Sequence, residues 1–242
     1  MSSRRAAELC LLSVVLLVPA ARAQLASGPA SLEARNEIQA GPLRGLSVEV
    51  ARLLMEAPSG GSLLSHVMAL PLPRREGKAP LVVVVEVDGD RLLEDFEGDR
   101  MEIEIYVYAL RPGGAVAAFL AQRVEVEITE LGEALFDSGL KFNGLLELDA
   151  GSYDVRVAVK RGQAFGLASQ AVTVAETPDD VPLPILADPE ARDAWVGVRQ
   201  WKRRGRQSTV GQLLVDERPV HPSAHPILVA GRLGSLYVFS TA

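Results

Sequence analysis

A strict two-residue alternation in the segment 101–110 is the feature that most constrains the fold. Every second residue there is apolar, and the residues between them include Glu102, Glu104, Tyr106 and Tyr108. Because successive side chains of a β-strand point to opposite sides, this period predicts a half-buried strand with the two glutamates on a solvated face. A helix would instead place the glutamates within the apolar stripe.

The same alternation recurs further along the chain. Segments 124–128 and 153–159 place charged residues between β-branched ones, and each predicts another half-buried strand. Segment 81–87 (LVVVVEV) is apolar almost throughout, which predicts a strand covered on both sides. Shorter strands are expected at 171–175, 46–54 and 67–72, whereas 31–38 is expected to be a short helix or a charged lead-in.

Turn residues separate the predicted strands. Glycine supplies a positive φ and proline a fixed one, which tight turns require. Many short strands joined by such turns predict an all-β fold, an antiparallel immunoglobulin-like β-sandwich. The turn signals are Asp88-Gly89, Pro112-Gly113-Gly114, Asn143-Gly144, Ala150-Gly151-Ser152 and Arg161-Gly162-Gln163.

Composition divides the chain into four parts. Residues 1–23 read as a signal peptide and 24–176 as the β-sandwich domain. Residues 177–189 hold four prolines and three aspartates, which predicts a linker. Residues 190–242 form a small β-rich C-terminal segment, which we expect to dock on the sandwich or on a partner because so short a segment buries little core.

The first 23 residues predict export. Arg4 and Arg5 precede the apolar run 9–18, and the small-x-small sequence 21–23 forms a cleavage site. We therefore expect a periplasmic or secreted product without a transmembrane anchor. A lipoprotein signal is the alternative, but Cys10, the single cysteine, stands at the start of the apolar run, whereas lipidation needs it at the end.

Charge and motif content argue against several function classes. The chain has 25 Lys plus Arg against 31 Asp plus Glu, a formal charge of −6, which predicts no nucleic-acid partner. The sequence contains no Gly-x-Ser-x-Gly, His-Glu-x-x-His, phosphate-cradling or dinucleotide-binding motif. We therefore predict that the protein is not an enzyme and uses no catalytic residues, no cofactor and no metal.

Segment 141–174 resembles the final hairpin of β-sandwich segments that follow the metal-binding domain in exported bacterial proteins related to the von Willebrand factor type A family. The matching elements are an apolar strand at 145–148, a small-Gly-x-Tyr turn at 151–153, an alternating strand at 155–159 and a glycine-containing loop into a last strand at 166–174.

The strand at 102–108 and the segment 221–228 are similar to other parts of that region. The Asp-x-Ser-x-Ser sequence of the family's metal site does not occur in this chain. The resemblance thus implies an exported β-sandwich module without metal-mediated activity, and fold alone is an associational basis for function.

Two groups of residues are candidates for binding metal. The acidic stretch 88–99 is rich in carboxylates that suit calcium, but it lacks the spacing of an EF-hand, and a solvated loop is the simpler interpretation. His221 and His225 are four residues apart, but the prolines around them exclude the helix that would bring both to one face. His66 is isolated in the sequence, and we interpret it as a surface or packing residue.

Glu102 and Glu104 are candidates for glycosidase carboxylates. They share one face about 7 Å apart along the predicted strand, within the range that such enzymes use. A solvated sheet face explains them more simply. The sequence Asp137-Ser138-Gly139 has the order seen in some acid hydrolases, but a single copy is more simply a turn.

Aromatic and basic residues concentrate near the C-terminus. Aromatic residues and arginine are enriched at protein interfaces, although a solvated hairpin tip at Gly205 would also explain the basic cluster 199–206. We predict a non-catalytic exported binding or assembly module that contacts another envelope or secreted protein. A carbohydrate-binding or hydrolytic envelope protein is the alternative. The predicted interaction residues are Trp195, Trp201, Arg203, Arg204, Tyr237 and Phe239.

Overall fold

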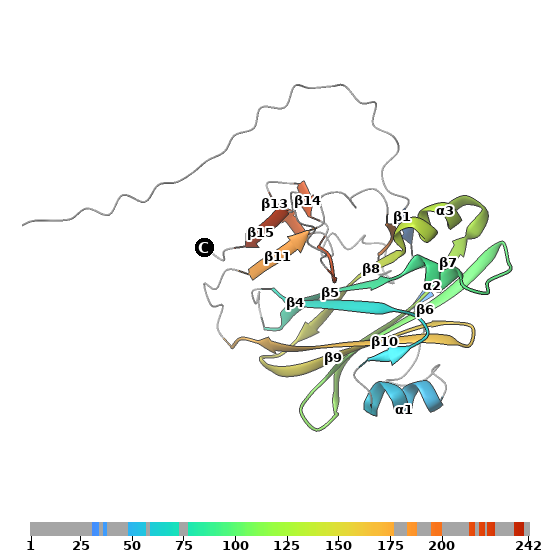
Figure 1. The fold of residues 1–242 in the computed structure, drawn as a ribbon. Helices are drawn as coiled ribbons and strands as arrows, with labels where there is room; N and C mark the ends of the chain where they lie inside the picture. Colours follow the sequence, from blue (N-terminus) through green and yellow to red (C-terminus); the bar gives the residue numbers. More distant parts are fainter. Residues whose placement is uncertain are drawn as a thin grey trace, which may run out of the picture.

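Two β-sheets pack face to face in the computed structural model of the chain (Figure 1). The structure describes residues 31–33, 36–37, 48–56, 59–72, 77–176, 183–187, 195–199, 213–215, 218–220, 222–225 and 235–239. The all-β sandwich predicted from the sequence is confirmed. The signal peptide predicted for residues 1–23 lies outside the described residues.

The first sheet has five strands in the order β1-β12-β8-β5-β4. Strands β4, β5 and β8 are antiparallel, whereas β12 runs parallel to both β8 and β1, so this sheet is mixed. The bounds are β1 (Ser31–Glu33), β4 (Ser65–Pro71), β5 (Ala79–Val87), β8 (Leu140–Leu148) and β12 (Val196–Arg199).

The second sheet has six strands in the order β2-β7-β6-β9-β10-β3, all antiparallel. The register of β6 against β7 shifts between Ala109 and Leu110. The bounds are β2 (Asn36–Glu37), β3 (Gly60–Gly61), β6 (Arg100–Leu110), β7 (Val116–Glu127), β9 (Gly151–Arg161) and β10 (Ala164–Val174).

Two small two-stranded sheets lie on the side of the five-stranded sheet in Figure 1. One pairs β11 (Leu183–Ala187) with β15 (Ser235–Phe239), and the other pairs β13 (Leu213–Val215) with β14 (Arg218–Val220). Strand β11 thus falls within the predicted linker 177–189. Strand β12 belongs to the predicted C-terminal segment 190–242 but is a member of the sandwich sheet.

The core lies between the two sheets and is built from the alternating positions. Leu81, Val83 and Val85 of β5 face Ile103 and Ile105 of β6 in one cluster, and all five side chains are fully buried. The intervening residues 82 and 84 are also buried, which confirms that β5 is covered on both sides. The period-two pattern therefore predicted the inward positions of β6 correctly.

The strand predicted at 46–54 is wrong, because the structure has helix α1 (Val48–Glu56) there. Val48 and Val50 favour β-structure locally, which misled the prediction. Helical spacing instead lets Leu54 be buried against Tyr106 and Tyr108 of the six-stranded sheet, and tertiary burial of this kind overrides a weak local preference.

The solvated face predicted for the polar side of β6 is confirmed only at Glu102, which is exposed, and is wrong for the rest of that side. That side carries Tyr106 and Tyr108, which are fully buried in a second apolar cluster, and Glu104 is buried beside them. Helix α1 contributes Leu54 to this cluster and so covers part of the outer face of the six-stranded sheet. The sandwich therefore has three layers where α1 lies on it (Figure 1).

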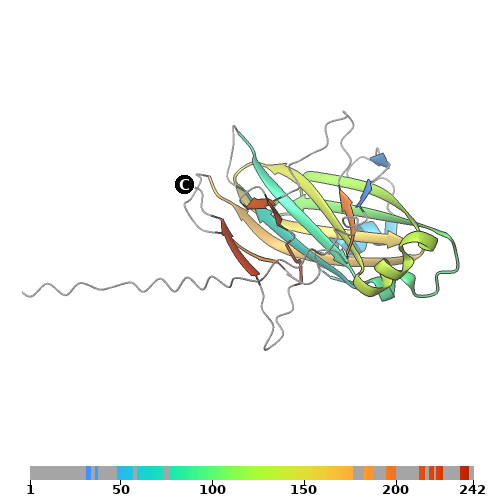
Figure 2. The same ribbon diagram turned by 90° about the horizontal axis from the view of Figure 1, so that it is seen from above.

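Other local elements differ from the sequence expectation. The short helix or lead-in expected at 31–38 is not found where this range is described, because residues 31–33 (β1) and 36–37 (β2) pair with the two sheets. Helices α2 (Gly89–Leu93) and α3 (Ile128–Ser138) were not predicted, and α3 lies at one end of the sandwich in both views (Figures 1 and 2). No helix in the described ranges is long and apolar enough to cross a membrane.

Candidate functional site

A row of side chains crosses the outer face of the five-stranded sheet. His66 of β4 is directly opposite Glu86 of β5, Glu86 is opposite Lys141 of β8, and Lys141 is opposite Gly197 of β12. Residues opposite one another on neighbouring strands have side chains on the same face. We call His66, Glu86 and Lys141 the transverse row.

The centre of the transverse row is a buried ion pair. The side chains of Glu86 and Lys141 are only 2% and 7% exposed, and Nζ of Lys141 lies 2.8 Å from Oε1 of Glu86, outside hydrogen-bond geometry. Removing two charges from water is costly, so such a pair needs further hydrogen bonds to be tolerated. Those bonds come from the segment that covers the pair.

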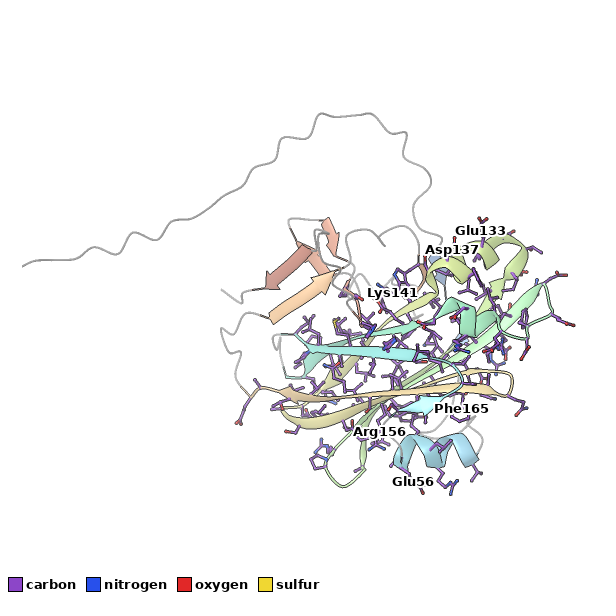
Figure 3. All side chains as sticks on the ribbon, in the orientation of Figure 1. Glu56, Glu133, Asp137, Lys141, Arg156 and Phe165 are labelled. Atoms are coloured by element: carbon purple, nitrogen blue, oxygen red, sulfur yellow. The ribbon has the colours of Figure 1, made fainter. Side chains whose placement is uncertain are left out.

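The segment Pro222–His225 lies over the ion pair, and we call it the docked segment. Lys141 donates from Nζ to the carbonyl of Pro222 at 3.1 Å. Oε2 of Glu86 accepts from the hydroxyl of Ser223 at 3.3 Å and from the backbone N–H of His225 at 3.0 Å. The pair therefore holds this short segment through its main chain and one hydroxyl. Figure 3 shows Lys141 on the side of the sheet where the C-terminal strands lie.

Trp195 also contacts the transverse row. Nζ of Lys141 lies 4.8 Å from the centroid of the Trp195 ring, within the range of a cation–π interaction. The ring is half-buried, and it lies close enough to Gly139 that a Cβ at this glycine would approach it to 3.1 Å. Trp195, predicted as an interaction residue, thus makes contacts within the chain.

The remaining predicted interaction residues have no side-chain description. Trp201, Arg203 and Arg204 lie outside the described residues. Tyr237 and Phe239 belong to β15, where their backbones pair with β11, and the structure does not describe their side chains. The interaction surface proposed for these residues stays a prediction.

His66 is not isolated in the fold. Its ring stacks on that of His225, with centroids 4.1 Å apart and planes inclined by 13°. Burial is the largest influence on His66 and lowers the pKa of its ring, and the charge of His225 lowers it further. The carboxylates of Asp88 and Glu86 act in the opposite direction but more weakly. The other histidine of the predicted pair, His221, lies outside the described residues.

Sequence reasoning missed the transverse row, although one signal was present. Glu86 is the single charge within the apolar run 81–87. A carboxylate in a strand buried on both sides requires a partner, because an unpaired buried charge is costly. The partners Lys141 and His225 are distant in sequence, so only the strand register and the path of the C-terminal segment reveal them.

A pocket of about 490 Å³ opens at the other sheet, beside the β9–β10 turn. Glu104 lies in its wall, only 10% exposed, where it accepts from Nη2 of Arg123 at 2.7 Å and from the Tyr106 hydroxyl at 3.0 Å. Glu102 lies 3.4 Å from Nε of the same arginine. The pocket is lined by Asp95, Phe96, Glu102, Glu104, Lys160, Arg161, Gly162, Gln163 and Ala164.

The glutamates proposed as glycosidase carboxylates are therefore ion-paired. Arg123 bridges Glu102 and Glu104, and the ammonium of Lys160 lies 3.5 Å from the second carboxylate. The two carboxyl groups of a glycosidase act from opposite sides of the scissile bond, whereas these two are held together on one arginine. This arrangement suits a structural network better than acid–base catalysis.

Two further arginines bind helix ends. Arg156 of β9 donates to the carbonyl oxygens of Leu54 and Met55 at the end of α1, the first at 2.6 Å (Figure 3). Arg161 donates to the carbonyls of Leu92 and Glu94 at 2.6 and 2.7 Å at the end of α2. The last carbonyls of a helix lack partners within it, and a cation there is favourable. These arginines attach the two helices to the six-stranded sheet.

The acidic stretch 88–99 is partly helical. Asp90 lies in α2, where its carboxylate accepts from the backbone N–H of Arg91, and Arg91 pairs with Glu94 at 3.1 Å. Across the described ranges, no group of three or more His, Cys, Asp or Glu side chains is placed to hold a metal ion.

Comparisons with known proteins give partial likenesses only. No family model and no curated protein matches the chain. A β-glucuronidase from glycoside hydrolase family 2 is similar in structure at a TM-score of 0.32 and 13% identity, over 49% of this chain and 11% of that one. A Bacteroides uniformis β-glucuronidase is similar at 0.31 and 12% identity, over 51% and 14%. The chain thus spans a small share of these enzymes, and likeness at this level carries no argument about activity.

Proposed function

We propose that this chain is a non-catalytic binding and assembly module that acts through protein–protein contacts. The observation that carries the proposal is the outer face of the five-stranded sheet, where Glu86 and Lys141 hold the segment Pro222–His225. Hydrogen bonds to the main chain are one common way in which proteins bind peptide segments. The sheet thus serves as a scaffold that fixes residues 222–225 in place.

The interactions of three arginines on the six-stranded sheet also support a role as a scaffold. Arg156 and Arg161 attach α1 and α2, and Arg123 joins Glu102 to Glu104. Each of these cations is engaged with carbonyls or carboxylates of the same chain, and such networks rigidify a structure. A rigid framework of this kind suits the presentation of surface loops.

The partner that we propose is another envelope or secreted protein. This follows from the signal peptide predicted at 1–23 and from the resemblance to exported type A-related proteins. The proposed contact region is the basic and aromatic stretch around Trp201, Arg203 and Arg204, since arginine and tryptophan are enriched among residues that dominate binding energy.

Cross-linking in envelope extract tests this proposal. The variant Arg203→Glu/Arg204→Glu should lose cross-linked partners that the unmodified chain captures, as identified by mass spectrometry. Arg91→Glu is a matched control because Arg91 is half-exposed on α2, far along the chain from the proposed contact region. Identical partners for the unmodified chain and the Arg203/Arg204 variant would refute the assignment.

Carbohydrate binding is the second candidate, and the pocket beside the β9–β10 turn is the observation that favours it. Phe96 offers an aromatic face there, and Lys160, Glu102 and Gln163 offer polar groups. A glycan array with the unmodified chain and Phe96→Ala tests this candidate, and a hydrolase screen tests turnover. Binding that is lost in Phe96→Ala would favour carbohydrate recognition over the protein-binding proposal.

A further inference from the structure

A pair of stacked histidines lies at the end of the docked segment. His225 is the last residue of Pro222–His225, and its ring covers that of His66 at a centroid distance of 4.1 Å. His66 belongs to β4, which is the last strand in the order of the five-stranded sheet. The stack therefore joins the docked segment to β4, while Ser223 and the backbone N–H of His225 join it to Glu86 of β5.

The charged groups that face this stack come from three places. Glu86 lies on β5, Asp88 follows β5, and Lys141 lies on β8. The two carboxylates favour a positive ring on His66, but one of them, Glu86, is already paired with Lys141. Burial of His66 and the charge of His225 act more strongly, and they lower the pKa of His66 below its ordinary value of 6.5.

We propose that the His66–His225 stack is a pH-sensitive latch, which holds Pro222–His225 on the sheet while the ring of His66 is neutral and releases this segment when that ring is protonated. A positive ring on His66 is poorly solvated while the ring of His225 covers it, and undocking exposes His66 to water. The inference concerns contacts within the chain and does not depend on the proposed function.

The direction of the pH dependence follows from proton linkage. The docked state lowers the pKa of His66, so it binds fewer protons than the released state. Docking is therefore fully stabilised above the ordinary histidine pKa of about 6.5 and weakens as the pH falls through the lowered value. Release would expose the ion pair of Glu86 and Lys141 to solvent.

Hydrogen exchange at the backbone amide of His225 reports docking directly, because Glu86 accepts a hydrogen bond from this N–H. After correction for the intrinsic pH dependence of exchange, we expect opening of the peptide that contains 222–225 to increase severalfold between about pH 7.5 and about pH 5. A peptide from β9 should show no such increase. Absence of the increase in the unmodified chain would overturn the proposal.

Variants show whether the histidine rings are responsible. His66→Gln removes the titrating ring and should abolish most of the pH-dependent opening, whereas His225→Gln removes the smaller contribution of the second ring and should reduce it. Both variants retain the backbone bond to Glu86. His221→Gln is the matched control, a neighbouring histidine that should leave the pH dependence unchanged. If the pH-dependent opening persists in both variants, a different group is responsible and the latch is contradicted. An equal increase in exchange throughout β9 would also contradict it, because the whole fold would then be opening.

Discussion

The side-chain amide of Gln170 on β10 bonds to both backbone groups of Ala69 on β4. Its Oε1 accepts from the Ala69 N–H at 2.7 Å, and its Nε2 donates to the Ala69 carbonyl at 3.3 Å. The amide thus acts as a partner for one residue at the edge of the five-stranded sheet and links the two sheets there. Unpaired edge groups are templates for pairing with another chain, so this contact also protects the edge.

We expect Gln170→Ala to lower the free energy of unfolding by about 1–3 kcal/mol, because it leaves two part-buried backbone groups without their partner. Self-association should increase at the same time. Urea unfolding and sedimentation velocity measure the two effects. Thr173→Ala on the exposed side of the same strand is the control, and equal behaviour of both variants would contradict the edge-closing role.

The ion pair of Glu86 and Lys141 predicts strong non-additivity. Glu86→Ala should cost about 3–5 kcal/mol because it leaves a buried ammonium without its anion. The double variant Glu86→Leu/Lys141→Leu should recover much of that loss, since an apolar pair of similar size suits a buried site. Urea unfolding of the two single variants and the double variant gives the coupling energy.

The same double variant separates stability from docking. It lacks the groups that bind Pro222, Ser223 and His225, so proteolysis within the docked segment should become faster even where global stability is restored. A stable double variant with unchanged cleavage would show that the ion pair does not hold this segment.

Arg156 should determine whether α1 stays on the sheet. Arg156→Met removes the donor to the carbonyls at the end of α1, and we expect the helix to detach and expose Tyr108. Burial raises the pKa of Tyr108 to about 12, so detachment should return its pKa toward the ordinary value of 10.0. Ultraviolet absorbance of the phenolate during an alkaline titration measures this change.

The pH dependence of the free energy of unfolding gives a second measurement, which can be made on the unmodified chain. A raised pKa means that Tyr108 stabilises the fold below its ordinary pKa and that this contribution is lost as the pH rises through the raised value. The loss should be smaller in Arg156→Met. Arg111→Met is the control, because Arg111 pairs with Asp149 at the surface, where ion pairs contribute little.

Gly89 should tolerate no side chain. A Cβ at this position would lie 1.6 Å from the carbonyl oxygen of Leu135, so α2 approaches α3 only because residue 89 is glycine. We expect Gly89→Ala to lower the melting temperature and to cost about 1–3 kcal/mol through overpacking. Gly98→Ala is the control, since its Cβ would meet the movable ring of Phe96, and an equal loss in both would contradict the close-packing explanation.

The parts of the fold that local pattern can specify were predicted well. The alternation around Ile103 and the apolar run that contains Val83 each correspond to a strand with the expected side buried. Such patterns can be interpreted without the tertiary structure, because successive side chains of any strand point to opposite faces. The segment that forms helix α1 was wrongly predicted as a strand because its β-branched residues favour a strand locally. The helix is favoured instead because it buries Leu54 against Tyr106.

The candidate site could not be predicted in the same way. His66, Glu86 and Lys141 are neighbours only because three strands pair in one particular register. His225 reaches them only because the C-terminal segment returns to the sheet. The residue pattern within one segment contains no information about the register between strands or about where His225 binds.

The sequence by itself determined the class of fold, since periodicity and turn residues act over a few neighbouring positions. The tertiary structure decided which charges are buried and what covers them. The physical reason is that the environment of a side chain depends on contacts with distant segments, and a carboxylate such as Glu86 is tolerated in an apolar strand only once Lys141 and the docked segment surround it.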